Sequence, residues 1–235
     1  MNVFDTAILE FLNQFSRLSW TFDSLIKFIS GNHLAKGGVL ILILWWAWFR
    51  VSKDQALVRV HLISTLISCF IGMVIAKSLA LTLPFRFRPL HVEDLNLVLP
   101  YGVNQSALEG WSSFPSDHSV LFYALAIGMF YVSRTTGILA IVYTTLLIAL
   151  PRVYLGLHYP TDIIAGIIIG LAIVLACNTP WFVEKISRPI FNFSTKKPEY
   201  FYPILFLITY QIVDLFSSGL NVLYFVKSIV DELIG

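Results

Sequence analysis

Two short stretches of this sequence place histidines beside residues that bind anions. Residues 115–118 read Pro-Ser-Asp-His, and a second stretch holds Arg152, His158 and Asp162 at the spacing Arg-x5-His-x3-Asp. Histidine is the side chain whose charge changes most readily near neutral pH. The guanidinium of arginine matches phosphate oxygens with two parallel hydrogen bonds. These residue types at this spacing indicate an anion-binding site for which phosphate is a suitable ligand.

More positive charge precedes the first stretch. Lys77, Arg86 and Arg88 lie in the run KSLALTLPFRFRP, residues 77–89. Ser116 follows a proline at the start of an apolar run, which predicts a helix N-cap, and the backbone N–H groups of a helix start bind anions well. A lone arginine at the end of a membrane span usually anchors the helix in the headgroups. The joint spacing, rather than any single residue, therefore indicates the site.

Ser116, Asp117 and His118 are the three side-chain types of a hydrolase triad, but they are consecutive. Neighbours at a helix start point about 100° apart, so we do not expect them to pass a proton among themselves. A carboxylate at a helix N-terminus stabilises the helix, yet it would repel a phosphate bound there. We therefore expect Asp117 to turn aside, either onto one of the arginines or into a role in keeping His118 protonated.

The composition of the chain places this site in a membrane. Hydrophobic residues make up 57% of the 235 residues and charged residues only 13%, whereas soluble domains carry about 25% charged residues. The mean hydropathy of +0.77 agrees. Cys69 and Cys177 both lie inside apolar runs, so we read them as small buried hydrophobes and not as a disulfide framework. We expect an integral membrane protein.

Six apolar runs are predicted to cross the membrane, because a span needs roughly 17–25 mostly apolar residues. The runs cover residues 34–49, 57–83, 119–132, 137–150, 163–182 and 202–216. The predicted fold class is all-α, a polytopic membrane helix bundle of about six transmembrane helices. We read residues 1–235 as a single domain with a catalytic core of about 57–182.

Both ends of the chain carry further predicted helices. Apolar residues recur at helical spacing from Phe4 to Phe15 among polar ones, which predicts an amphipathic helix lying in the membrane surface. A helical hairpin that dips into the bilayer is the alternative. A last apolar helix is expected over residues 220–234.

The fifth run also predicts how its helix packs. Asp162, Gly166 and Gly170 are spaced at i, i+4 and i+8, so they share one helical face. Small residues at this spacing let another helix approach closely. We expect the stripe to face the bundle interior, with a dimer face as the alternative.

Basic residues in the loops predict the orientation of the bundle. One face of the predicted topology carries Arg50, Lys53, Arg59, Arg134, Lys185, Arg188, Lys196 and Lys197. The opposite face carries a loop over residues 90–115, which has no Lys or Arg. Cytoplasmic loops are enriched in Lys and Arg, so the basic face is predicted to be cytoplasmic. The anion site then faces the periplasm or the outside of an inner (cytoplasmic) membrane.

The chain resembles the type 2 phosphatidic acid phosphatase (PAP2) family of membrane lipid phosphatases. The family motifs are K-x6-R-P, P-S-G-H and S-R-x5-H-x3-D, and here the second reads PSDH and the third PRVYLGLHYPTD. The first is imperfect, because ten residues separate Lys77 from the Arg88-Pro89 pair and Phe87 follows Arg86. Pro151 also replaces the serine of the third motif. The resemblance covers about half of the chain.

The resemblance implies a hydrolase that works through a phosphohistidine. His158 matches the nucleophile, Asp162 would fix its tautomer by accepting from its other nitrogen, and His118 would protonate the leaving oxygen. Opposite starting charges on two histidines predict a bell-shaped pH–rate curve. The residues expected to bind the substrate phosphate are Arg152, Arg88, Ser116, Lys77, Arg86 and Asp117.

We expect no cofactor and no metal, because the cations can neutralise the phosphate themselves. The alternative is a zinc site made of His118, His158 and Asp162, which the four neighbouring cations would disfavour by repulsion.

The expected partners are a lipid phosphate or diphosphate and the bilayer, with no nucleic acid. PSDH in place of PSGH resembles the bacterial undecaprenyl-diphosphatase branch, so undecaprenyl diphosphate is the substrate that the resemblance leads us to expect. A phosphatase for phosphatidic acid or phosphatidylglycerol phosphate is the alternative within the family. A non-enzymatic anion or lipid transporter is the alternative outside it, although a transporter needs a path across the bilayer.

Overall fold

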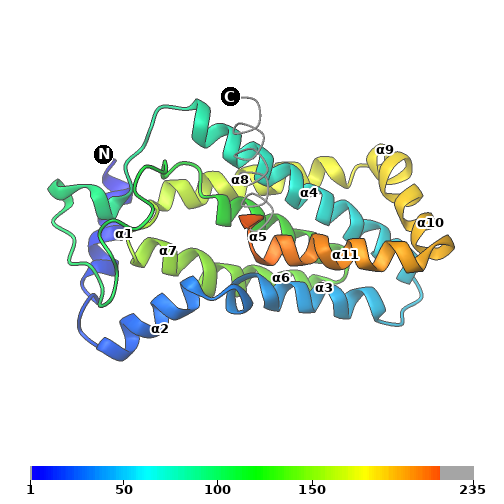
Figure 1. Cartoon of the computed structure of the whole chain (residues 1–235), viewed down its shortest axis with the longest axis horizontal. Coiled ribbons are helices and arrows are strands. Elements are labelled where there is room, and N and C mark those ends of the chain that lie inside the picture. The colour runs from blue at the N-terminus through cyan, green and yellow to red at the C-terminus, as the bar shows by residue number, and fades with distance from the viewer. Residues whose placement is uncertain (1, 218–235) are drawn as a thin grey trace, which may run out of the picture.

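The apolar runs form a bundle of helices in the computed structural model, which describes residues 2–217 (Figure 1). No strand occurs within this range, so the predicted all-α class is confirmed. The helices are α1 (Val3–Asn13), α2 (Trp20–Gly31), α3 (Val39–Phe49), α4 (Gln55–Thr82), α5 (Asp117–Gly128), α6 (Arg134–Tyr143), α7 (Leu150–Tyr154), α8 (Pro160–Cys177), α9 (Pro180–Phe182), α10 (Arg188–Lys196) and α11 (Pro198–Val213). Short 3-10 and π-helical turns join or extend several of them.

Three helices of the described chain are long and apolar enough to cross a membrane: Gln55–Thr82, Arg134–Tyr154 and Pro160–Cys177. A fourth span results if α2 and the helix over Leu34–Phe49 count as one, and these two meet at a bend of 72°. The predicted third and sixth runs form α5 and α11, which have 12 and 16 residues. The number of crossings therefore stays a prediction, and the helix expected over residues 220–234 lies outside the described residues.

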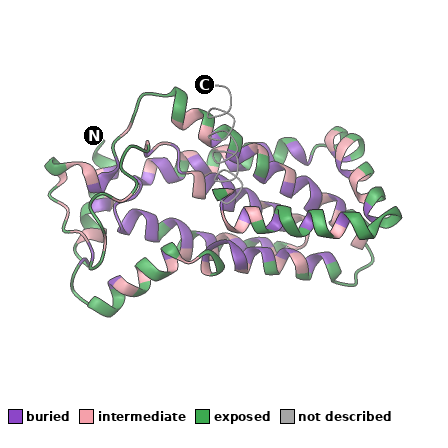
Figure 2. Ribbon diagram, viewed as in Figure 1, coloured by how far each residue is buried: buried purple, intermediate pink, exposed green. Residues whose placement is uncertain are grey.

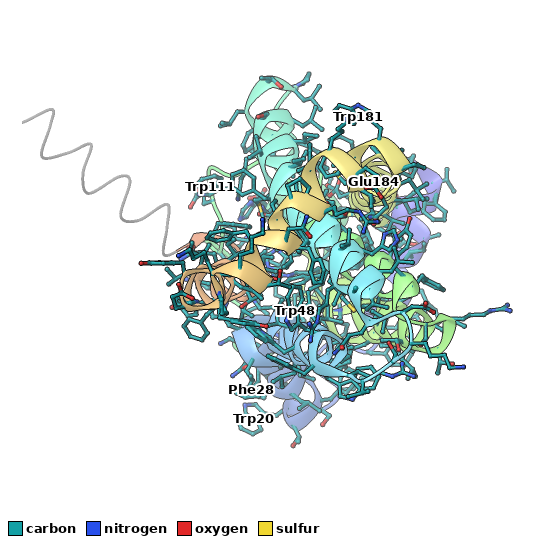
Figure 3. The ribbon with its side chains drawn as sticks, turned by 90° about the vertical axis from the view of Figure 1, so that its right-hand side faces the viewer. Trp20, Phe28, Trp48, Trp111, Trp181 and Glu184 are labelled. Atoms are coloured by element: carbon teal, nitrogen blue, oxygen red, sulfur yellow. The ribbon has the colours of Figure 1, made fainter. Side chains whose placement is uncertain are left out.

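Helix α5 forms the centre of the bundle, packed between α4 and α8. Every residue from Ser119 to Ala126 is buried, and purple ribbon marks the buried interior in Figure 2. Viewed from the end that carries α9 and α10, Trp48 lies within the bundle, whereas Trp181 projects from its edge (Figure 3).

The glycine stripe of α8 faces α5, which confirms the prediction that it points into the bundle. A methyl group added at Gly166 would lie 2.5 Å from the Cβ of Ser119, and one at Gly170 would lie 2.8 Å from the carbonyl oxygen of Val120. Because these contacts leave no room for a side chain, glycine allows α8 to approach the helix that carries His118.

The N-terminal helix α1 packs on the bundle instead of standing apart from it. It contacts α7 and α8, and Leu9 joins a buried cluster that includes Val153, Tyr159 and Ile163. Asp5 is fully buried on the same face, whereas Phe4 and Phe11 are exposed. Helix α1 therefore points the acidic Asp5 into the bundle, whereas two of its large apolar side chains, Phe4 and Phe11, point outward.

The long segment between α4 and α5 is hydrogen-bonded to the end of α1 and to the turn that follows it. The carbonyl oxygen of Val98 accepts hydrogen bonds from Asn13 Nδ2 (2.8 Å) and Ser16 Oγ (2.6 Å). Leu99 accepts from Arg17 Nε at 2.8 Å. This segment, α1 and the start of α8 lie at one end of the molecule, opposite α9 and α10 (Figure 1).

Candidate active site

Three segments that are distant in the sequence meet at this end of the bundle. They are the stretch after α4, the first turn of α5 and the turn between α7 and α8. The predicted site residues they contribute are largely buried: Arg88 is 6% exposed, Arg152 7%, His158 2%, and Ser116 and Asp162 0%. Arginine, histidine and aspartate at such low exposure need specific partners.

His158 lies on the turn between α7 and α8. Gly156 has a φ of +68°, a conformation that glycine adopts without strain, and a Cβ there would lie 3.1 Å from Leu90. The backbone N–H groups of Leu157 and His158 both donate to the carbonyl oxygen of Arg152, at 2.9 and 3.3 Å. The turn therefore holds His158 at a fixed place beside Arg152.

One ring nitrogen of His158 is paired with the backbone. Nδ1 lies 2.8 Å from the carbonyl oxygen of Ser113. A carbonyl only accepts, so Nδ1 carries the hydrogen and Nε2 keeps its lone pair. Burial, followed by the charge of Arg88, lowers the pKa of His158 below its usual value, although Asp162 opposes this shift. The backbone contact and the lowered pKa together favour a neutral imidazole whose lone pair is on Nε2.

Asp162 lies behind His158 and is not its direct partner. The distance from its Oδ2 to His158 Nδ1 is 3.7 Å. Oδ2 instead accepts hydrogen bonds from Ser113 Oγ at 2.5 Å and from the backbone N–H of Tyr159 at 2.8 Å. The expected direct contact is therefore replaced by an indirect one, in which Asp162 holds the residue whose carbonyl binds His158. Ser113 was not identified from the sequence.

Arg88 and Arg152 flank the two histidines. Arg88 Nη1 donates to the carbonyl oxygen of Leu157 at 2.7 Å and lies 3.2 Å from His158 Nε2. Arg152 Nη2 contacts His118 Nε2. The Nε atoms of both arginines are buried without a hydrogen-bond partner within residues 2–217. Because an unpaired buried donor is costly, these N–H groups would be stabilised by an anionic acceptor.

His118 occupies the first turn of α5 and pairs with its neighbour. Its Nδ1 lies 2.8 Å from Oδ1 of Asp117, and Oδ2 of Asp117 lies 2.9 Å from Lys77 Nζ. This contact agrees with the expected alternative in which Asp117 interacts with His118. Asp117 does turn aside, onto Lys77 and the His118 ring rather than onto an arginine.

Ser116 is the N-cap of α5, as predicted. Its Oγ accepts from the backbone N–H of Ser119 at 3.4 Å and from the Ser119 hydroxyl at 3.2 Å. Neither contact involves the His118 ring, so the three consecutive residues do not form a triad in the described structure.

The remaining two predicted cations are paired with carboxylates. Lys77 binds Asp117 and lies over the ring of Trp111, 5.2 Å from its centroid. Arg86 binds Asp162 at 2.5 Å and Asp5 at 2.8 Å. Both residues therefore reach the candidate site, but their charges are shared with acidic side chains.

The structure adds Lys36 to the basic residues of this region. It is 4% exposed, lies at the bend before α3, and is within electrostatic reach of Arg152 and Asp117. A signal was present in the sequence, because Lys36 is the only charged residue in the apolar run of residues 34–49 and charges at membrane depth are usually functional.

No group of three or more His, Cys, Asp and Glu side chains within residues 2–217 is arranged to hold a metal ion. The donors of the zinc alternative therefore lack the clustering that tetrahedral coordination requires. The absence of a cofactor stays a prediction.

Comparison with known proteins gives a family match. The model of the PAP2 superfamily matches residues 60–185, more than half of the chain. No solved structure matches the chain.

Three relatives indicate the range of proteins that the chain is similar to. The bacitracin transport permease protein BcrC of Bacillus licheniformis is 25% identical over 62% of this chain and 64% of its own length. The undecaprenyl-diphosphatase BcrC of Bacillus subtilis is 26% identical over 75% of this chain and 88% of its own. The putative undecaprenyl-diphosphatase YbjG of Escherichia coli is 26% identical over 60% and 65%. The match spans less than two thirds of the first and third relatives.

Proposed function

The chain belongs to the PAP2 superfamily. From this premise we propose that it is a membrane lipid phosphatase that converts undecaprenyl diphosphate to undecaprenyl phosphate and phosphate. Two of the relatives carry the name undecaprenyl-diphosphatase. The observation that carries the catalytic part is the pairing of His158 Nδ1 with Ser113, because it leaves the lone pair on Nε2, which lies 3.2 Å from Arg88 Nη1.

In the first step, Nε2 of His158 attacks the terminal phosphorus. A P–N bond forms while the bond to the bridging oxygen breaks, and the lipid monophosphate leaves. Arg88 and Arg152 would hold the phosphate oxygens with their unpaired Nε–H groups as charge develops. Lys77, on α4, and Ser116, at the start of α5, would also help to stabilise the negative charge of the phosphate.

His118 would supply the proton that the leaving oxygen takes up. Burial, followed by the charge of Arg152, lowers the pKa of His118 well below its usual value, and Asp117 beside its Nδ1 opposes this shift by favouring the charged imidazolium. Nε2 faces the guanidinium of Arg152, and two donors repel each other. A phosphate that accepts from both would remove this repulsion, so binding of the substrate would itself favour protonated His118.

In the second step, water attacks the phosphohistidine. His118, now neutral, takes a proton from that water, the P–N bond breaks, and phosphate leaves. The proton balance closes because the proton given in the first step is regained in the second.

An apolar groove suits the hydrocarbon tail of the substrate. It has a volume of about 880 Å³ and runs between α4, α10 and α11, with Lys77 at its lining. Lys77 Nζ is 2.9 Å from Asp117, which contacts His118. We place the tail in this groove and the diphosphate at the histidines.

Val74→Trp, on the groove wall, should then raise the KM for undecaprenyl diphosphate more than for farnesyl diphosphate. Ile164→Trp, an equally apolar change on α8 outside the groove, is the control, and equal effects on both substrates would contradict the placement.

We also propose that the protein lies in the cytoplasmic membrane with the site facing outward. The support is the basic composition of the opposite loops. Single cysteines introduced at Gly110 and at Lys53 test this orientation when intact cells are treated with an impermeant thiol reagent. We expect labelling at position 110, and labelling at position 53 alone would show the opposite orientation.

The test of the proposed function is phosphate release by the purified protein in EDTA. Undecaprenyl diphosphate, phosphatidic acid and phosphatidylglycerol phosphate are the substrates compared. We expect fastest release from the diphosphate, and faster release from either glycerolipid would favour that alternative. Loss of activity in EDTA that added metal restores would contradict the mechanism.

A further inference from the structure

A fully buried carboxylate enters the site region from the N-terminal helix. Asp5 on α1 has 0% exposure. Its Oδ1 accepts from the backbone N–H of Thr161 at 2.9 Å, and its Oδ2 accepts from the Thr161 hydroxyl at 2.7 Å. Thr161 lies in the first turn of α8. Asp5 therefore binds the start of the helix that carries Asp162.

Arg86 joins this carboxylate to Asp162. Its Nη2 donates to Asp5 Oδ2 at 2.8 Å and its Nη1 to Asp162 Oδ1 at 2.5 Å. Nη1 also lies 3.0 Å from the Thr161 hydroxyl, and the guanidinium stacks over the ring of Tyr159 at 4.0 Å. One guanidinium thus holds two carboxylates that are 157 positions apart in the sequence.

The contacts continue from Asp162 to the nucleophile of the proposed reaction. Asp162 Oδ2 accepts from Ser113 Oγ at 2.5 Å, and the Ser113 carbonyl lies 2.8 Å from His158 Nδ1. Asp5, Arg86, Asp162 and Ser113 form an unbroken series of polar contacts that ends at His158. None of the first three touches the unpaired Nε–H groups of Arg88 or Arg152.

We propose that Asp5 is a positioning residue for catalysis, which acts through Arg86 to hold Asp162 and the His158 turn. This inference rests on the proposed function, because it assigns Asp5 to the same reaction. Because Arg86 is shared between Asp5 and Asp162, its positive charge is not spent on Asp162 alone, and Asp162 keeps part of its negative charge. The pair also occupies the guanidinium with carboxylates, which compete with a substrate phosphate for Arg86.

Removing the charge of Asp5 without changing its shape tests the inference. Asp5→Asn can still accept from the Thr161 N–H, but its amide faces Arg86 with a donor. We expect kcat to fall by about 10–100-fold, the loss typical when the group behind a catalytic residue is removed, with KM unchanged. Glu10→Gln is the matched control, because it removes the same charge from an exposed position of the same helix.

The pH profile provides a second readout that a purely structural role would not move. The charged groups facing His158 are Arg88 at 3.2 Å, Asp162 at 3.7 Å and, at longer range, Asp117. Loss of the Asp5 charge disfavours protonation of His158, so the acid limb of kcat/KM should move to lower pH in Asp5→Asn and stay in place in Glu10→Gln.

A double-mutant cycle decides whether Asp5 acts through Arg86. In the Arg86→Gln background, Asp5→Asn should cause little further loss of kcat, and additive losses would overturn the inference. If Asp5→Asn does not fold, Thr161→Ala replaces it, because the Thr161 hydroxyl bonds both Asp5 and Arg86. Unchanged kcat in the folded variant would likewise overturn the inference. Failure of the wild-type protein to release phosphate would contradict the proposed function instead.

Discussion

His158 Nδ1 lies 2.8 Å from the backbone carbonyl of Ser113 and 3.7 Å from the carboxylate of Asp162. The carbonyl therefore selects the tautomer, while the carboxylate orients Ser113 through its hydroxyl. Replacing a side chain does not remove a backbone carbonyl, but it can shift the carbonyl when the replaced side chain anchored that residue. Substitutions at Asp162 or Ser113 should consequently impair catalysis by misplacing His158 rather than by removing its partner.

Ser113→Ala tests this relationship. The variant keeps the carbonyl that binds His158 but loses the 2.5 Å hydrogen bond to Asp162. We expect kcat to fall by about tenfold or somewhat more, with KM nearly unchanged, in steady-state phosphate release. Ser106→Ala, in an exposed part of the same segment where the hydroxyl bonds only Asn104, is the control. Full activity of Ser113→Ala would mean that the carbonyl alone positions His158.

The unpaired Nε–H groups of Arg88 and Arg152 predict that lysine cannot replace either residue. Lysine keeps the charge but loses the planar fork and the Nε donor. We expect Arg88→Lys and Arg152→Lys each to lower kcat about 10²–10³-fold, the loss typical for one donor to a developing oxyanion. Arg134→Lys, at an exposed position, should behave as wild type. Loss confined to KM would indicate ground-state binding only.

The lowered pKa of His158 predicts where activity is lost in acid. Burial disfavours the charged ring, and the nucleophile must be neutral. The neutral fraction therefore falls only when the pH drops through a value below the usual histidine pKa of about 6.5. We expect the acid limb of kcat/KM below that value. An acid limb at or above pH 6.5 would show that His158 is not desolvated as described.

Close packing of α8 on α5 predicts a stability difference between two glycines. A Cβ at Gly170 would lie 2.8 Å from a backbone carbonyl, whereas Gly31 has no atom within 4 Å. Gly170→Ala should therefore lower the free energy of unfolding by about 1–3 kcal/mol. Gly31→Ala should be neutral or slightly stabilising. Thermal unfolding in detergent measures both, and equal midpoints would contradict the helix contact.

Residues whose roles depend on short spacing could be identified from the sequence. Helical spacing placed the glycine stripe of α8 correctly, and the polar residues that end the apolar runs do gather at one end of the bundle. Asp5 and Ser113 could not be found this way. Asp5 meets Thr161 across 156 positions, and Ser113 lies in an irregular segment without periodicity. For Asp117 the sequence left two partners open, an arginine or His118, and the structure shows His118 together with Lys77.

The central claim is that Nε2 of His158 carries the phosphoryl group during turnover. Rapid mixing of the protein with undecaprenyl diphosphate labelled in its terminal phosphate, followed by quenching in alkali, preserves phosphohistidine for mapping. We predict an acid-labile phosphate on Nε2 of His158, because Ser113 occupies Nδ1, and no labelled protein or phosphate release in His158→Ala. Label on another residue, or turnover by His158→Ala, would contradict the account.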